Sequence, residues 1–274
     1  MNRIDRMFSQ LRKRGESALI PFITTGDPDV ATTEALVLEM ERQGADLIEL
    51  GLPFSDPLAD GPTIQAASNR ALANEINARV LFDMVKRLRQ KTDIPLVLMG
   101  YCNPLFQYGI EEFARDAAEA GIDGTIIPDL PVDEASQWGR AAREHGICNI
   151  FLVAPNTPDA RMKKIAKASK GFIYYVSVTG ITGARSELPP ELSQGLKHVR
   201  EITSKPVAVG FGISEPAQVR MLSEVADGII VGSAIVRIIE KNLVETGSGF
   251  SAGPATVKSV GEFVSSLKQA TLTR

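Results

Sequence analysis

The feature that most constrains the fold is an alternation of short apolar segments with amphipathic ones. Each of eight apolar segments is followed by a segment with helical periodicity. The predicted strands cover residues 19–24, 47–51, 94–101, 124–127, 147–154, 172–177, 206–210 and 228–231. Strand–helix alternation implies parallel strands joined by right-handed crossovers. Eight such units predict an α/β protein with a closed (β/α)8 TIM barrel.

The main alternative is an open, doubly wound sheet. That fold usually carries a glycine-rich fingerprint after its first strand, whereas Thr24-Thr-Gly-Asp-Pro28 follows here. No linker divides the 274 residues, a length that single barrels commonly have. We therefore predict one domain over residues 1–274, with additional helices after strands two and eight. These helices are expected at residues 63–73, 78–91, 233–240 and 254–267, with a flexible connection at 247–253.

An extra N-terminal helix is also predicted. Its apolar residues follow i, i+3, i+4, i+7 spacing and are Ile4, Met7, Phe8 and Leu11. The segment lacks the apolar region of a signal peptide, and no apolar run reaches the roughly 18 residues of a membrane span. We expect a cytoplasmic protein without membrane contact.

Composition and spacing argue against several kinds of partner and chemistry. The formal net charge is −3 and no basic run is present, so no nucleic acid is expected. Cys102 and Cys148 lack C-x-x-C spacing, and they are read as reduced thiols. His145 and His198 fall on predicted helices, so neither a metal site nor a Ser–His triad is predicted. No lysine ends a strand, which disfavours a Schiff base.

Two carboxylates stand where a barrel enzyme carries its active site, at the carboxyl end of a strand. Glu49 lies inside an apolar strand, where ionisation is costly. Two roles are open to Glu49, a buried ion pair with a basic residue or proton transfer by a carboxyl with a raised pKa. The lack of a basic residue at the strand ends favours proton transfer. Asp60 lies in the following loop, where turn chemistry and catalysis are equally open.

Glycines follow the seventh and eighth strands, in Gly210-Phe-Gly212 and Gly232-Ser-Ala234. Barrels often bind phosphate at these loops, with backbone N–H groups and a helix N-terminus directed at the anion. Tight turns and a capping serine are the alternative, but two glycine pairs together with Thr182-Gly183 favour phosphate. Apolar and aromatic side chains near the strand ends are mostly core, yet the same groups suit a flat apolar substrate.

These residues resemble the tryptophan synthase alpha-chain family. The match rests on residues 49–65, Glu-Leu-Gly-Leu-Pro-Phe-Ser-Asp-Pro-Leu-Ala-Asp-Gly-Pro-Thr-Ile-Gln. It is extended by residues 21–28, 128–131, 174–183, 209–213 and 231–233, so it covers essentially the whole chain. The resemblance implies a carbon–carbon lyase of tryptophan biosynthesis. Its reaction would be the reversible retro-aldol cleavage of indole-3-glycerol phosphate to indole and glyceraldehyde 3-phosphate.

The resemblance also implies roles for individual residues. Glu49 would protonate C3 of the indole and then accept the glycerol hydroxyl proton, Asp60 would bind the indole N–H, and Tyr174 would position the substrate. The phosphate would be held by Gly183, Gly212, Gly232 and Ser233. The indole ring would be enclosed by Phe22, Met99, Tyr101, Ile127 and Phe211.

A partner follows from the same resemblance. The family implies no cofactor in this chain and a beta chain that carries pyridoxal phosphate, in an α2β2 heterotetramer that passes indole between subunits. The expected interface consists of the loops at residues 53–60 and 103–104, because they rim the site. The loop at residues 179–190 is expected to be either a mobile lid or a merely disordered loop.

Two rival functions remain at this stage. One is another phosphate-binding barrel enzyme, such as the ring-closing synthase that makes the same indole phosphate. That chemistry typically relies on a strand-end lysine, which is missing here. The other is a barrel that only binds or regulates, against which intact Glu49 and Asp60 argue.

Overall fold

The structure, a computed structural model, describes residues 2–177, 190–210, 212–247 and 249–272. Its main sheet has nine strands in the order β5-β4-β3-β2-β1-β9-β8-β7-β6, and neighbouring strands are parallel. The two end strands, β5 (Cys148–Ile150) and β6 (Leu152–Val153), are consecutive and separated only by Phe151. They form one interrupted strand, so the sheet closes on itself. The predicted eight-stranded barrel is confirmed.

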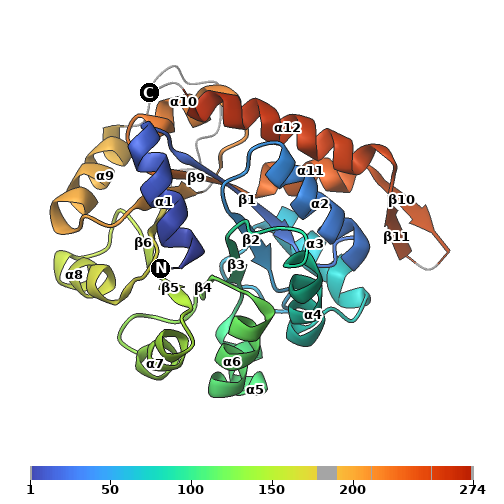
Figure 1. The fold of residues 1–274 in the computed structure, drawn as a ribbon, viewed down its shortest axis with the longest axis horizontal. Helices are drawn as coiled ribbons and strands as arrows, with labels where there is room; N and C mark the ends of the chain where they lie inside the picture. Colours follow the sequence, from blue (N-terminus) through green and yellow to red (C-terminus); the bar gives the residue numbers. More distant parts are fainter. Residues whose placement is uncertain (1, 178–189, 211, 248, 273–274) are drawn as a thin grey trace.

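The remaining barrel strands lie within the predicted segments, except that β1 begins one residue earlier. They are β1 (Ala18–Thr24), β2 (Ile48–Gly51), β3 (Leu96–Met99), β4 (Gly124–Ile126), β7 (Ile173–Val176), β8 (Val207–Gly210) and β9 (Gly228–Val231). Helices surround the barrel in Figure 1. They are α1 (Arg3–Arg14), α2 (Val30–Arg42), α3 (Pro62–Ala73), α4 (Ala78–Leu88), α5 (Cys102–Tyr108), α6 (Ile110–Ala120), α7 (Ser136–Glu144), α8 (Asp159–Ala168), α9 (Pro190–Ile202), α10 (Pro216–Ser223), α11 (Ser233–Lys241) and α12 (Ala255–Thr271).

Side chains alternate along each strand between the barrel interior and the helical layer. Leu47 and Val97 belong to the interior cluster. Ile48, Leu50 and Leu96 belong to the cluster that joins the strands to the surrounding helices. Glu49 therefore lies on the interior face of β2, as its position between Ile48 and Leu50 predicts.

Helix α1 closes the barrel at the amino ends of the strands, and Figure 1 shows it lying across the strands. Its apolar face, Ile4, Met7, Phe8 and Leu11, is buried in the interior cluster. The ring of Phe8 packs on Phe172, just before β7, with centroids 5.7 Å apart. Arg3 adds an ion pair to Asp123, just before β4. The predicted N-terminal helix is thus confirmed, and its position leaves the opposite end of the barrel for a site.

Two segments differ from the sequence prediction. The connection predicted to be flexible at residues 247–253 contributes to an antiparallel hairpin of β10 (Leu243–Thr246) and β11 (Gly249–Ala252). The hairpin is largely exposed, so its sequence lacks the apolar alternation that marks a buried strand. Residues 103–104 were predicted to be a loop, but they lie in helix α5, whose first turn accommodates Pro104. The additional helices after β2 and β9 are confirmed as α3, α4, α11 and α12.

None of the helices in the described ranges is both long and apolar enough to cross a membrane.

Candidate active site

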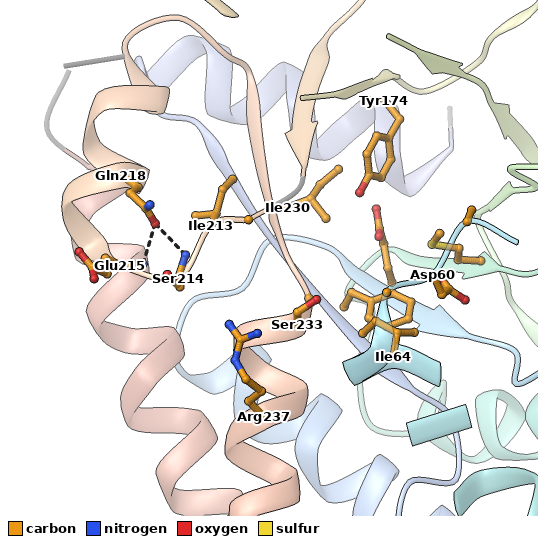
Figure 2. Close-up of a pocket in the computed structure, with 17 residues that line it drawn as sticks. Asp60, Ile64, Tyr174, Ile213, Ser214, Glu215, Gln218, Ile230, Ser233 and Arg237 are labelled. Carbon is orange, nitrogen blue, oxygen red and sulfur yellow. Dashed lines mark hydrogen bonds between the residues drawn. The ribbon is translucent and has the colours of Figure 1, made fainter. Parts of the chain in front are cut away.

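A cavity of about 370 Å³ opens at the carboxyl end of the barrel, a size typical of small-molecule sites. Residues from distant parts of the chain meet here, as Figure 2 shows. The predicted residues that line it are Phe22, Glu49, Asp60, Met99, Tyr174, Gly212, Gly232 and Ser233. The structure therefore brings the carboxylates, the glycine loops and part of the apolar lining into one site.

Glu49 occupies the floor of this site. It lies opposite Phe22 of β1 and Val97 of β3 in the sheet register. Its side chain is fully buried, and neither carboxylate oxygen has a hydrogen-bond partner among the described residues. Burial without a compensating charge raises the pKa of Glu49 to about 8. At neutral pH the group is mainly protonated and can donate a proton into the cavity. The alternative of a buried ion pair finds no partner in the part of the chain described.

Tyr174 of β7 is buried close to both carboxylates. Burial raises the pKa of its hydroxyl well above the ordinary value, and the charges of Glu49 and Asp60 raise it further. Tyr174 therefore stays neutral. Gly210 at the end of β8 makes room for this ring, because a Cβ atom there would lie 2.7 Å from Tyr174 Cζ. The glycine predicted as part of a phosphate loop is thus also required by packing.

Asp60 lies in the loop between β2 and α3, and the loop is held on both sides. The Ala59 N–H donates to the hydroxyl oxygen of Tyr101 over 3.1 Å, and the Gln65 side chain donates to the carbonyl of Asp60 over 2.8 Å. Burial raises the pKa of Asp60, and a hydrogen bond from Tyr101 partly offsets that rise. The carboxylate is thereby fixed at the rim of the cavity, where it can accept a hydrogen bond from a ligand.

The glycine loops form the opposite side of the cavity. Gly212 has φ +75°, a left-handed conformation that favours glycine. The buried side-chain oxygen of Gln218 accepts hydrogen bonds from the N–H groups of Ser214 at 2.8 Å and Glu215 at 3.1 Å (Figure 2). This capping arrangement fixes the loop that follows Gly212. Helix α11 begins next to it, so its unpaired N–H groups are available to an anion.

A buried ion pair ties together three elements around the cavity. Arg70 of α3 contacts both carboxylate oxygens of Asp27, which follows β1, at 2.7 and 2.9 Å. The same guanidinium reaches Glu240 of α11 at 3.2 Å. Asp27 is 1% exposed, so the pair is shielded from solvent. Arg70 therefore fixes the position of α3 relative to β1 and α11.

Some predicted lining residues are placed differently. Tyr101 supports the Asp60 loop and packs on Phe54, with ring centroids 5.3 Å apart, but it is outside the set of cavity residues. Ile127 is buried in the cluster beneath the helices, because the preceding Ile126 takes the interior position. Gly183 and Phe211 lie outside the described residues, as does the predicted loop at 179–190 except for Pro190.

Sequence reasoning missed other residues of the cavity. They are Ala59, Gly61, Ile64, Ile213, Ser214, Glu215, Gln218, Ile230 and Arg237. Two of them carried a usable signal. Strand alternation places Ile230 inside the barrel, and Arg237 follows Ser233 by one helical turn on α11. Across the described ranges, no group of three or more His, Cys, Asp or Glu side chains is arranged to hold a metal ion.

Comparison with known proteins gives a consistent result. The family model for "Tryptophan synthase alpha chain" matches residues 8–267. The tryptophan synthase alpha chain of Geobacter sp. strain M21 is 49% identical, and the alignment covers 99% of this chain and 98% of the relative. That of Citrifermentans bemidjiense is 50% identical with the same coverage.

Solved structures agree with this comparison. The tryptophan synthase alpha chain of Legionella pneumophila superposes with a TM-score of 0.87 at 37% identity, covering 99% of this chain and 97% of that one. A chain from the tryptophan synthase a2b2 complex of Pyrococcus furiosus superposes with a TM-score of 0.83 at 42% identity, covering 92% of this chain and 98% of that one.

Proposed function

The chain belongs to the tryptophan synthase alpha-chain family, and we propose that its cavity carries out the reversible retro-aldol cleavage of indole-3-glycerol phosphate to indole and glyceraldehyde 3-phosphate. The observation that carries the proposal is the state of Glu49. A fully buried, unpartnered carboxyl with a pKa of about 8 is suited to give and to take a proton near neutral pH. It lies in the same cavity as the glycine loops proposed for phosphate.

Cleavage without a Schiff base requires the substrate to hold the electrons of the broken bond. Glu49 donates its proton to C3 of the indole, which becomes an indolenine with positive charge at the ring nitrogen. The Glu49 carboxylate then removes the proton from the hydroxyl next to the scissile bond. The C–C bond breaks, the hydroxyl carbon becomes the aldehyde of glyceraldehyde 3-phosphate, and the bonding electrons restore the aromatic indole. Glu49 ends the cycle protonated.

Asp60 and Tyr174 assist this proton transfer. Asp60 accepts a hydrogen bond from the indole N–H and stabilises the positive charge that develops there. Tyr174 stays neutral and positions the substrate above Glu49. These roles agree with a cavity that contains all three side chains.

The two ends of the substrate have matching sides of the cavity. Phe22 and Met99 line the apolar side, and we assign the ring to them together with Phe211. Tyr101 contributes through the Asp60 loop that it holds, and Ile127 packs beneath the helices and is not assigned to the ring. We assign the phosphate to Gly183, Gly212, Gly232 and Ser233.

The partner is a tryptophan synthase beta chain in an α2β2 complex, as in the Pyrococcus furiosus complex to which this fold is similar. The predicted interface loops support this assignment, because each carries or adjoins an exposed apolar side chain. Leu58 is 90% exposed and Phe106 of α5 is 53% exposed. We assign pyridoxal phosphate to the beta chain, no cofactor to this chain, and both chains to the cytoplasm.

An indole-release assay on the purified chain, with and without its beta chain, tests the function. We expect release from indole-3-glycerol phosphate, acceleration by the beta chain, and co-elution of the two chains on size exclusion. Glu49→Gln should abolish release while substrate still binds, and Asp60→Asn should lose much of the rate. Glu245→Gln, the same type of change on the exposed hairpin, is the control. Near-normal turnover by Glu49→Gln would refute the mechanism.

A further inference from the structure

Arg237 is the one cationic side chain among the described residues of the cavity. It lies four positions after Ser233 on α11, so both side chains project from the same face of that helix. Figure 2 shows the Arg237 side chain extending along α11 towards Ser233 and Ser214. This side chain thus reaches the part of the cavity where the glycine loops and the start of α11 meet.

The charge balance of the cavity favours a cation. Asp60 and Glu215 line it with acidic side chains, in addition to Glu49, which is mainly protonated at neutral pH. A phosphate monoester adds about −1.5 to −2 charges at pH 7. The groups so far assigned to the phosphate are backbone N–H groups and the Ser233 hydroxyl, which carry no net charge. They orient the anion but leave its charge uncompensated except by the partial charge of the helix end.

Arg237 is available to supply that charge. It is exposed and has no ion-pair partner among the described residues, whereas Arg70 of the neighbouring α3 is already bound to Asp27 and Glu240. A guanidinium presents its donors in a planar fork that matches two phosphate oxygens.

We propose that Arg237 pairs with the phosphate of the substrate and sets the preference of the site for phosphorylated over unphosphorylated substrates. The proposal rests on the proposed function. Arg237 contributes binding, not proton transfer, because the phosphate is held apart from the reacting C3 of the indole. Its loss should therefore appear in KM and not in kcat.

The test compares indole-3-glycerol phosphate with indole-3-glycerol, which lacks the phosphate. The variants are Arg237→Gln, Arg237→Lys and the control Lys241→Gln, which removes the same charge from an exposed position on the same helix. We expect Arg237→Gln to raise KM for the phosphorylated substrate about tenfold. Its kcat should stay within about twofold. Turnover of indole-3-glycerol should not change. Arg237→Lys should raise this KM less than Arg237→Gln does, because lysine keeps the positive charge but lacks the planar, two-pronged donor geometry of the guanidinium.

Inorganic phosphate provides a readout that does not depend on turnover. Calorimetric titration should show weaker phosphate binding to Arg237→Gln than to wild type or Lys241→Gln. Equal phosphate affinity and equal KM in the two glutamine variants would refute the proposal. Equal losses on both substrates would also refute it, since they indicate a structural role. Absence of indole release by the wild type would instead refute the proposed function, and the phosphate titration separates the two failures.

Discussion

The hydroxyl oxygen of Tyr101 accepts a hydrogen bond from the backbone N–H of Ala59, 42 positions earlier in the chain. Tyr101 stands at the start of α5, after β3, whereas Ala59 directly precedes Asp60 in the loop after β2. A tyrosine at the end of β3 thus holds the loop that follows the neighbouring strand β2 and carries Asp60. This contact helps to position Asp60.

Tyr101→Phe should therefore slow the reaction without unfolding the protein. The variant loses the hydrogen bond from the Ala59 N–H and the one to the Asp60 side chain, each worth about 1 kcal/mol, so we expect kcat/KM to fall by about fivefold or more as the Asp60 loop loosens. Tyr108→Phe is the matched control, because its hydroxyl donates to Asp116 of α6, away from the cavity. Steady-state indole release measures both variants, and equal rates would show that the Tyr101 contact does not position Asp60.

The pH dependence of the rate should report Glu49. Its protonated form starts the cycle, and burial raises its pKa to about 8. We expect kcat to fall as pH rises through about 8, with a single ionisation. The measurement is kcat at saturating substrate from pH 6 to 9.5. A rate that stays constant above pH 8 would exclude Glu49 as the proton donor.

Glu49 should also make stability depend on pH. Its pKa is raised from 4.5 to about 8, so between these values the native state binds a proton that the unfolded chain has lost. This contribution is fully present below about pH 4.5 and is lost as pH rises to about 8, by up to about 1.4 kcal/mol per unit. Glu49→Gln removes it. Urea unfolding at pH 6 and 8.5 measures the free energy of unfolding of both proteins. The stability of Glu49→Gln relative to wild type should be greater at pH 8.5 than at pH 6. The same difference at both pH values would contradict the burial argument.

Arg70→Gln should be strongly destabilising. It leaves the carboxylate of Asp27 buried without its partner, which costs about 3–5 kcal/mol. Arg42→Gln breaks an exposed, solvent-screened pair with Glu39 and should have a much smaller effect. The double variant Asp27→Asn/Arg70→Gln should recover part of the loss. Free energies of unfolding in urea decide the matter, and similar losses for Arg70→Gln and Arg42→Gln would count against a structural ion pair.

Gly210→Ala should displace Tyr174. The added Cβ would overlap the Tyr174 hydroxyl and lie 2.7 Å from Cζ, so we expect a loss of about 1–3 kcal/mol in stability together with lower kcat/KM. Adding Tyr174→Phe should restore part of the stability by removing the closest atom. Gly247→Ala, where the new methyl meets open space, should be neutral. Normal stability of Gly210→Ala would show that the ring moves freely.

Periodicity predicted the barrel because each buried strand carries its own apolar signal and each helix its own spacing. The importance of Glu49 could be predicted for the same reason, since a carboxylate inside an apolar strand interrupts the apolar pattern. Residues such as Gln218 and Tyr101 were not assigned their roles, because those roles depend on which N–H groups the fold brings to them. The hairpin at Leu243–Ala252 escaped detection because its strands are paired only with each other and leave no burial pattern.

Helix α1 closes the barrel at the amino ends of the strands, so the cavity of the described residues opens at their carboxyl ends. Its apolar side chains fill the amino-terminal end of the barrel and belong to the interior cluster; they are Ile4, Met7, Phe8 and Leu11. A product released above Glu49 would leave at the carboxyl end of the barrel, which the segments at residues 53–60 and 103–104 rim. A beta chain docked on those segments would cover the route by which product leaves.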